Sequence, residues 1–340
     1  MTNFLQSDAW ARFQSDLGHE VLRGAGEGYS YLATVEGGRA GRYLYCPYGP
    51  EADSPEALTR ALAELKELAR AHRCLFVRVE PSDPRSFAEG TDPQADLRAR
   101  GLRFSPRQIQ PSHTWMVDLT QDEDALLKGM NATNRNLHRN IHKKGVSFRA
   151  SRDPEEIGIL LRYLNQTAER VGFNRQKDDY LTQAARSLMP QGDAALYVAE
   201  LHGEPIGAAF VYDSADTRTY AHASMDYAHR RLSANNPLVT RMMLDAKEAG
   251  LRRFDMFGIA PEGQPDHEWA GFTKFKKSYG GYPVTYPGTW DLPVSTAAYA
   301  AFRSVYAAKE AAKEKGLPAA RRLAGTAEQK VRGLVGRLRR

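Results

Sequence analysis

The sequence contains only two cysteines, Cys46 and Cys74, which are too few for a disulfide framework. No apolar run approaches the roughly 18 residues that a transmembrane helix needs. The first residues show neither the basic nor the apolar region of a secretion signal. These absences exclude a disulfide-rich secreted scaffold and an integral membrane protein. We therefore expect a cytoplasmic protein in which both thiols are ordinary core residues.

Several catalytic signatures are also missing. The chain has no Ser-His-Asp order, no Walker loop and no cluster with metal-ligand spacing. The sequence therefore predicts no metal and no bound cofactor. Positioning of the reactants, with the proton moved by the substrate or by water, is the simplest mechanism to expect.

The composition describes an ordinary folded protein, with 42% hydrophobic and 26% charged residues. Its 340 residues favour two domains. The charge is uneven, because residues 301–340 contain 11 Lys/Arg against 3 Asp/Glu, a net of +8, whereas the whole chain carries +6. The basic character belongs to the C-terminal tail, which could meet phosphates or anionic lipid.

The two halves of the chain show the same order of expected elements: a strand meander, a helix and a further strand. Expected strands lie at 29–35, 42–46, 74–79, 194–200, 206–212, 218–222 and 253–257, and expected helices at 55–72 and 237–249. This repeat predicts an α+β fold of two similar domains. We expect domain 1 at 1–148, completed by part of 290–315, domain 2 at 149–292, and a basic helical tail at 293–340. A basic helix is expected over 126–144.

The second half has the element order of an N-acetyltransferase-like (GNAT) domain. In such domains the turn before the long helix is rich in glycine, because its backbone N–H groups bind the pyrophosphate of CoA. Here that turn, residues 230–237, contains no glycine, and Pro237 has no N–H. An acyl-CoA-dependent N-acyltransferase is therefore disfavoured but stays open as an alternative.

Five stretches form an ordered set along the chain: FLQSDAWARF at 4–13, MNATNRNLHRNI and KKGV within 130–146, AERVGFNR with Tyr180, FDMFG at 254–258, and FTKFKKSYGG continuing to YPGTWDL at 292. Together they resemble the Fem family of aminoacyl-tRNA-dependent transferases, which build peptidoglycan interpeptide bridges on twin GNAT-like domains. The chain lacks the long coiled-coil insertion of many members and is similar to the shorter ones.

The resemblance implies a transferase that moves an amino acid from aminoacyl-tRNA to a Lys-type amine of a peptidoglycan stem peptide. The precursor that carries this peptide is lipid-linked or nucleotide-linked, and both options stay open. A monomer is expected. Besides the acyl-CoA enzyme, a non-catalytic tRNA- or membrane-binding protein is the remaining alternative.

The resemblance implies that Phe275 and Lys276 hold the aminoacyl end, with the Lys276 ammonium near the developing oxyanion. The alternative is that the lysines of this run form a solvated surface. Glu80 and Asp255 end equivalent strands in the two halves. Each is a candidate for accepting a proton or binding the incoming ammonium, although acids at strand ends also cap turns.

Seven residues are candidates for binding the precursor: Trp10, Arg12, Arg175, Lys177, Tyr180, Tyr220 and His222. Family members carry a basic residue in the first helix that contacts the precursor diphosphate, and arginine suits bidentate phosphate binding. Arg175 and Tyr180 match a family pair on the same precursor, with Lys177 as the alternative cation. Tyr220 and His222 lie on an expected central strand and could line the acceptor site, or could be packed residues.

Six basic residues are candidates for binding tRNA phosphates: Arg135, Arg139, Lys143, Lys144, Lys274 and Lys277. An amphipathic surface helix is the alternative for the 126–144 segment. The tail over 296–340 mixes Leu and Val with Arg and Lys, which predicts peripheral contact with anionic lipid at the inner face of the cell membrane. The alternative for this tail is a solubilising helix.

Overall fold

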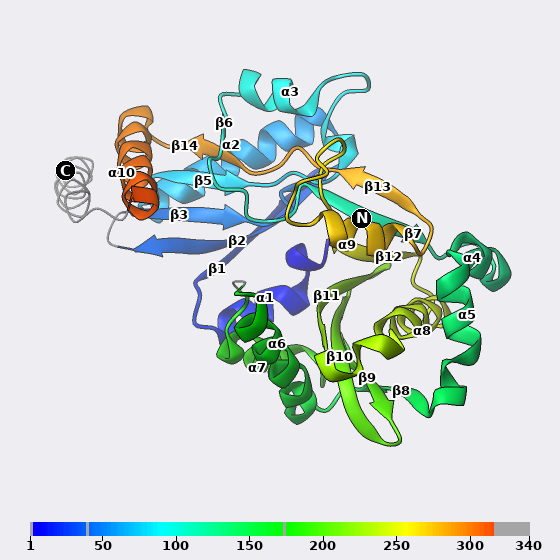
Figure 1. Ribbon diagram of the computed structural model, residues 1–340. Helices are drawn as coiled ribbons and strands as arrows, with labels where there is room; N and C mark the ends of the chain where they lie inside the picture. The colour runs from blue at the N-terminus through cyan, green and yellow to red at the C-terminus, as the bar shows by residue number, and fades with distance from the viewer. Residues whose placement is uncertain (1–2, 39–40, 173–174, 316–340) are drawn as a thin grey trace. The chain divides into compact units, whose positions relative to one another are not determined.

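The computed structural model describes residues 3–38, 41–172 and 175–315 (Figure 1). The chain divides into two compact units. Unit 1 combines residues 1–17 with 111–285, and unit 2 combines residues 18–110 with 286–340. This division differs from the predicted boundary at 148/149, because strands on both sides of that boundary pair within one sheet.

Unit 1 contains a seven-stranded sheet in the order β13-β7-β12-β11-β10-β9-β8. All neighbours pair antiparallel except β11 and β12, which are parallel. The strands are β7 (His113–Asp118), β8 (Val146–Ser151), β9 (Ala194–Leu201), β10 (Glu204–Asp213), β11 (Thr217–Met225), β12 (Arg253–Gly258) and β13 (Tyr282–Thr285). Residues 111–118 therefore belong here because β7 pairs with both β12 and β13.

The helices of unit 1 are α1 (Asp8–Asp16), α4 (Glu123–Gly129), α5 (Ala132–Asn140), α6 (Ile157–Val171), α7 (Asp178–Leu188), α8 (Asn235–Glu248) and α9 (Ala270–Lys277). Short 3₁₀ turns are η1 (Phe4–Gln6), η3 (Ile141–Lys144), η4 (Pro154–Glu156) and η5 (Tyr227–Leu232). Helix α8 buries Leu238, Met242 and Ala246 completely in the main core, as its stripe of apolar residues predicts. Helix α6 contacts β10 and β11, and α1 contacts α7.

The single helix predicted over 126–144 is wrong, because the segment breaks into α4, α5 and η3. Met130 is extended, with φ −73° and ψ 157°, and ends α4. The side chain of Asn131 then accepts a hydrogen bond from the backbone N–H of Asn134 at 2.8 Å and starts α5. An asparagine N-cap of this kind satisfies an otherwise unpaired N–H and favours a new helix.

Unit 2 contains a second seven-stranded sheet in the order β1-β2-β3-β5-β14-β6, with β4 paired to β2. Its strands are β1 (Val21–Gly26), β2 (Tyr29–Gly38), β3 (Gly41–Cys46), β4 (Glu51–Ala52), β5 (Phe76–Val79), β6 (Arg103–Phe104) and β14 (Trp290–Pro293). Its helical elements are α2 (Pro55–Ala71), η2 (Pro84–Ser86), α3 (Pro93–Ala99) and α10 (Thr296–Lys315). Strand β14 pairs with β5, so the chain returns to this sheet after unit 1.

Helix α2 explains how unit 2 forms its core. Ser54 caps the helix through the N–H of Ala57, and the proline that follows the cap suits the first helical position. Leu58, Leu62 and Leu65 recur at helical spacing and are buried in the core of unit 2. The two units thus each have their own sheet and their own hydrophobic core.

The predicted basic tail is described only in part. Residues 296–315 form α10, and the remainder of the segment, including most of its basic residues, lies outside the described residues. Within the described part of the chain, no helix combines the length and the apolar composition needed to cross a bilayer.

Candidate functional site

The candidate site of unit 1 begins where β11 and β12 stop pairing. Their parallel register runs only from Thr217↔Arg253 to Thr219↔Asp255, although β11 continues to Met225 and β12 to Gly258. Ligands in α/β sheets commonly bind outside the carboxyl ends of parallel strands, where neighbouring strands diverge. The residues at these two strand ends therefore form the candidate site.

Asp255 lies at an irregularity in β12. The register with β7 shifts between Asp255 and Gly258, and Phe257 has φ 64°, a left-handed conformation that bulky residues rarely adopt. The Asp255 carboxylate accepts hydrogen bonds from the Thr114 hydroxyl and from the Phe257 N–H at 2.7 Å. Burial raises the pKa of Asp255, while these two hydrogen bonds act in the opposite direction. The bulge thus fixes one carboxylate at the strand end.

Lys276 reaches the same strand end from α9. Its ammonium donates a hydrogen bond to the Gly258 carbonyl. Burial lowers the pKa of Lys276 to about 8, opposed by the charge of Asp255. At that pKa roughly one molecule in ten is neutral at pH 7. An ammonium has three donors, and within the described residues Gly258 is its only hydrogen-bond partner, so two donors stay available for a ligand.

A polar network connects α9 to the first turn of α8. The Asn134 amide donates to the carbonyl and the hydroxyl of Ser278, at 3.2 and 2.8 Å, and accepts from the Asn236 amide at 2.7 Å. The Tyr279 hydroxyl donates to the Asn236 carbonyl at 3.0 Å, and the Phe275 ring packs edge-on against Tyr279 at 5.3 Å. The network therefore connects two of the family-like sequence stretches, residues 130–146 and 272–292. The hydrogen bond from Lys276 to Gly258 connects residues 272–292 to a third stretch, residues 254–258.

The first turn of α8 is poorly equipped to bind an anion through its backbone. The Asn236 N–H already donates to the Ser233 carbonyl at 3.1 Å, and Pro237 has no N–H. A CoA pyrophosphate would need such free donors. The hydrogen bonding of this turn and its lack of glycine therefore both disfavour binding of a CoA pyrophosphate here.

Tyr220 and His222 lie on opposite faces of the sheet, which the sequence does not predict. Phe210 pairs with His222 but Val211 pairs with Tyr220, because a bulge interrupts the register between β10 and β11. The Tyr220 hydroxyl donates to the side-chain oxygen of Asn235 at 3.2 Å, on the α8 side. Burial lowers the pKa of His222 to about 4. The structure therefore does not bring these two predicted acceptor residues together.

The stretches at 4–13 and 168–180 meet elsewhere in unit 1. The Tyr180 ring packs edge-on against Phe13 at 5.1 Å. Trp10 is buried and its ring contacts Phe13 at 5.2 Å, so it is part of the core. Arg12 is half-exposed and forms an ion pair with Asp193. A role of these residues in precursor binding stays a prediction.

The side chain of Arg175 already forms hydrogen bonds with neighbouring side chains. Its guanidinium donates to the Asp178 carboxylate at 2.5 Å and also to the side-chain oxygen of Asn165. Lys177 is exposed at the start of α7. Of these two candidate cations, Lys177 is the more accessible to a ligand.

The predicted tRNA-binding residues differ in how many hydrogen bonds their charged groups already form within the protein. Arg135 donates to the carbonyls of Lys128, at 3.1 Å, and Met130, and thereby caps the end of α4. Lys143 donates to Asn140 at 2.8 Å. The exposed members of the set are Arg139, Lys143, Lys144, Lys274 and Lys277, and the ammonium of the last lies 5.4 Å from the centre of the Trp115 ring.

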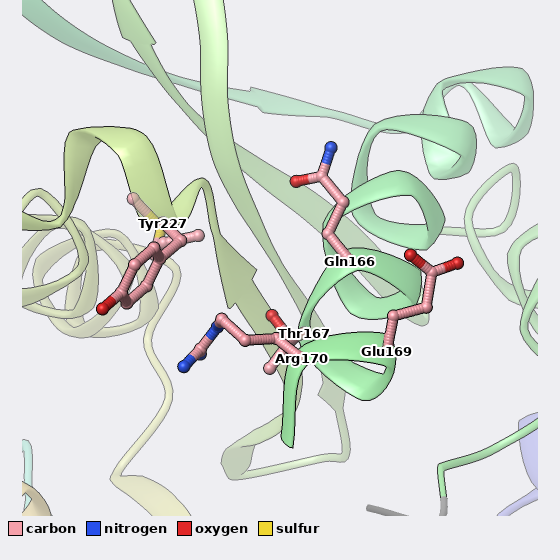
Figure 2. Close-up of a pocket in the computed structure, with 6 residues that line it drawn as sticks. Gln166, Thr167, Glu169, Arg170 and Tyr227 are labelled. Atoms are coloured by element: carbon pink, nitrogen blue, oxygen red, sulfur yellow. The ribbon is translucent and has the colours of Figure 1, made fainter. Parts of the chain in front are cut away.

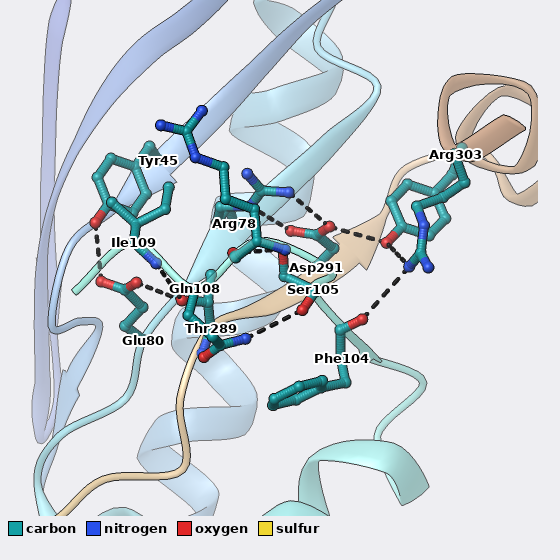
Figure 3. A network of polar contacts seen from close by, with 12 residues as sticks. Tyr45, Arg78, Glu80, Phe104, Ser105, Gln108, Ile109, Thr289, Asp291 and Arg303 are labelled. Carbon is teal, nitrogen blue, oxygen red and sulfur yellow. Dashed lines mark hydrogen bonds and ion pairs between the residues drawn. The ribbon is translucent and has the colours of Figure 1, made fainter. Parts of the chain in front are cut away.

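Glu80 belongs to unit 2, where its carboxylate accepts four hydrogen bonds, and Figure 3 shows the one from Tyr45. The donors are the hydroxyls of Thr289 (2.6 Å) and Tyr45 (2.9 Å) and the backbone N–H groups of Gln110 (3.1 Å) and Tyr48 (3.4 Å). Burial raises the pKa of Glu80, and the four hydrogen bonds oppose that rise. These contacts account for a structural carboxylate, and a catalytic role for it stays a prediction.

Four residues of the site are not among those expected from the sequence: Thr114, Asn134, Asn236 and Tyr279. A signal exists for Asn134, because asparagine is unfavourable inside a helix and its presence there often marks a specific hydrogen bond. Asn236 precedes Pro237 at the expected start of α8, where polar side chains commonly form caps. The contact between Thr114 and Asp255 joins residues 141 positions apart, and no local pattern predicts it.

The sequence comparisons identify two relationships, of which the family model lies within unit 1. The model of the acetyltransferase (GNAT) domain family matches residues 128–270. A lipid II:glycine glycyltransferase of Staphylococcus aureus is 28% identical over 153 residues, which cover 43% of this chain and 36% of the relative. The match thus spans little more than a third of that relative's length.

The structural comparisons cover most of the chain. The crystal structure of FemX aligns with a TM-score of 0.76 and 20% identity, over 86% of this chain and 92% of FemX. The C-terminal domain of a putative lysylphosphatidylglycerol synthetase from Agrobacterium fabrum aligns with a TM-score of 0.56 and 15% identity, over 85% of this chain and 88% of that domain. The predicted α+β fold of two tandem GNAT-like domains is confirmed.

Proposed function

We propose that this chain is a member of the Fem family of tandem GNAT-fold proteins and an aminoacyltransferase of peptidoglycan synthesis. The proposed donor is an amino acid esterified to the 3′ end of tRNA, and the acceptor is a Lys-type amine of a precursor stem peptide. The amine attacks the ester carbonyl, an amide bond forms, and the ester bond breaks. The tRNA 3′-oxygen leaves and receives the proton that the amine gives up.

The observation that carries this proposal is the position of Lys276. Its ammonium is half-buried at the end of β12, keeps two donors free of protein partners in the described residues, and lies near the charge of Asp255. A preorganised cation of this kind stabilises the oxyanion that forms when an amine attacks an ester. The same cation supports binding of the terminal phosphate of the donor.

The acceptor must lose a proton before it attacks. A free lysine amine titrates near ~10.4, so roughly one in a thousand is neutral at pH 7. A neighbouring ammonium such as Lys276 disfavours the protonated acceptor and so raises the neutral fraction. Water takes this first proton, and after the attack the departing 3′-oxygen takes the second proton from the nitrogen, so the reaction requires no dedicated protein base.

The first turn of α8 favours tRNA over acyl-CoA as the donor. Asn236 has its N–H engaged and Pro237 has none, so the pyrophosphate of CoA finds few backbone donors there. The relative named lipid II:glycine glycyltransferase supports a peptidoglycan precursor as acceptor. Peripheral membrane contact through residues 296–340 is part of the proposal for a lipid-linked acceptor and is unnecessary for a nucleotide-linked one.

The test is to incubate the protein with a pool of charged tRNAs and either a lipid-linked or a nucleotide-linked precursor, and to measure the product mass. We expect one precursor to gain the mass of an amino acid residue, which identifies both substrates. Lys276→Ala is the loss-of-function variant, and Lys128→Ala, at an exposed lysine of α4, is its matched control. Acetyl transfer from acetyl-CoA, or tight CoA binding by calorimetry, without aminoacyl transfer would contradict the proposal.

A further inference from the structure

Unit 1 contains a cavity of about 420 Å³ that the site described above does not use. It lies against α6, the end of β11 and η5 (Figure 2). Its lining residues are Gln166, Thr167, Glu169, Arg170, Met225 and Tyr227. This volume falls within the range of small-ligand pockets, roughly 300–1,000 Å³.

Tyr227 is an exposed aromatic ring held between two guanidinium groups. Its relative exposure is 50%, which is high for a large aromatic residue. The guanidinium carbons of Arg170 and Arg230 lie 4.3 and 4.1 Å from the centre of the ring. Arg230 also donates to the Tyr227 carbonyl at 2.9 Å, which fixes it to its own turn. Cation–π contacts at these distances orient both cations around one ring.

The two guanidinium groups are not neutralised by the protein. Within the described residues neither Arg170 nor Arg230 forms an ion pair, whereas Arg149, Arg218 and Arg253 of the same unit are all paired with carboxylates. Two unpaired cations beside an aromatic ring are suited to a ligand that carries both a phosphate and a planar base.

The cavity lies at the same end of the sheet as Lys276. Strands β11 and β12 are parallel, and they no longer pair beyond Thr219 and Asp255. Strand β11 ends at Met225, which lines the cavity. Strand β12 ends at Gly258, whose carbonyl accepts a hydrogen bond from Lys276. A ligand that enters at the carboxyl ends of these strands can therefore meet both groups.

We propose that Tyr227, Arg170 and Arg230 bind an unpaired nucleotide near the 3′ end of the donor RNA. This inference rests on the proposed function. A base can stack on a guanidinium plane that the ring supports, and the N–H groups of the guanidiniums bind the phosphate. The carboxylate of Glu169 and the amide of Gln166 can pair with amino and carbonyl groups of a base edge. The adenosine phosphate of CoA has the same chemistry, and the experiment separates the two sources.

The experiment measures binding of an uncharged, fluorescein-labelled acceptor-stem hairpin by anisotropy. One hairpin ends in single-stranded CCA, and its control is blunt. Tyr227→Ala removes the ring, and Tyr227→Phe keeps it. Arg186→Ala, an exposed arginine of α7, and Tyr282→Ala, an exposed aromatic of β13, are the matched controls. Melting temperatures establish that each variant is folded, and unlabelled CoA is tested as a competitor.

Tyr227→Ala should bind the CCA hairpin about five- to 150-fold more weakly, whereas Tyr227→Phe and both controls should bind like the wild type. Arg170→Ala and Arg230→Ala should each reduce the slope of log affinity against log salt by about 0.7. The blunt hairpin should show no effect of Tyr227→Ala. Unchanged binding of the CCA hairpin, equal weakening of both hairpins, or displacement of the RNA by micromolar CoA would overturn the inference.

Aminoacyl transfer by the wild type, measured on the same preparation, separates the two proposals. Transfer together with unchanged RNA binding by Tyr227→Ala overturns the nucleotide site and leaves the proposed function standing. The expected loss of RNA binding in Tyr227→Ala, without any transfer by the wild type, supports the nucleotide site and contradicts the proposed function.

Discussion

The two units place carboxylates at corresponding points of related sheets and use them differently. In unit 1, Asp255 lies near the end of β12, which pairs in parallel with β11. In unit 2, Glu80 directly follows β5, which pairs in parallel with β3. Glu80 accepts four hydrogen bonds from its own unit, whereas Asp255 accepts two and lies beside a lysine that keeps two donors without a partner in the part of the chain that the structure describes.

The cations of the two units show the same difference. Arg78 in unit 2 is buried and donates two hydrogen bonds to Asp291, at 2.7 and 2.9 Å (Figure 3). The Tyr299 hydroxyl donates a third hydrogen bond to the Asp291 carboxylate, at 2.8 Å. Lys276 in unit 1 has one hydrogen bond to a carbonyl. Arg78 thus stabilises unit 2 through a buried ion pair, whereas Lys276 in unit 1 keeps two donors without a partner among the described residues.

The largest effect in this comparison is expected in unit 2. Arg78→Ala leaves Asp291 buried without its cation, and breaking a buried ion pair costs about 3–5 kcal/mol. Denaturant unfolding measures this loss. A loss below about 1 kcal/mol would show that the ion pair is not a structural element of unit 2.

In unit 1 the expected loss is in activity. Lys276→Ala should lower the rate of aminoacyl transfer by about 10²–10³, the usual effect of removing one preorganised oxyanion donor. Single-turnover assays with charged tRNA measure it, with Lys128→Ala, at an exposed lysine of α4, as the control. If both variants retain the wild-type rate, Lys276 has no part in the reaction.

His222 gives unit 1 an expected sensitivity to acid. Its pKa is about 4 in the folded protein and ~6.5 when unfolded, so its neutral form stabilises the fold above pH 6.5 and this stability is lost as the pH falls towards 4. Between pH 7 and 5 this residue should account for a loss on the order of 2 kcal/mol. His222→Gln should lack that part of the loss in urea titrations at the two pH values. Identical pH dependence in both proteins would contradict this assignment.

The smallest effect is expected at the half-exposed ion pair of Arg12 and Asp193. Surface pairs of this kind contribute about 0–1 kcal/mol, so Arg12→Ala should leave the free energy of unfolding nearly unchanged. Precursor affinity, measured by calorimetry, should fall if the arginine contacts the diphosphate, by about 1.5–3 kcal/mol. Wild-type affinity in this variant would remove Arg12 from the predicted acceptor site.

The sequence predicts the fold well for physical reasons. Alternating and helical apolar patterns locate the strands and the stripe of α8, because burial requires those spacings. Phe275, Lys276 and Asp255 lie in stretches that resemble a family, and the structure brings these stretches together. Local patterns could not show that a single bulge turns Tyr220 and His222 to opposite faces, since the bulge depends on pairing between strands.

Long-range contacts explain the other differences. The four donors to Glu80 come from residues as far apart as Tyr45 and Thr289, so its structural environment is visible only in the folded chain. The unit boundaries depend likewise on β7 pairing with β12 and on β14 pairing with β5. Neither pairing has a local sequence signal, because each joins segments more than 100 residues apart.

The most direct test of the central claim, that unit 1 holds an available and desolvated cation, is the titration of Lys276. Lysine labelled with ¹³C at the ε-carbon allows its pKa to be measured by NMR in the free protein, and Lys276→Arg assigns the signal. We predict a midpoint of about 8, well below those of the exposed lysines. A midpoint near ~10.4, the ordinary value for lysine, would show that Lys276 is solvated and would contradict the account.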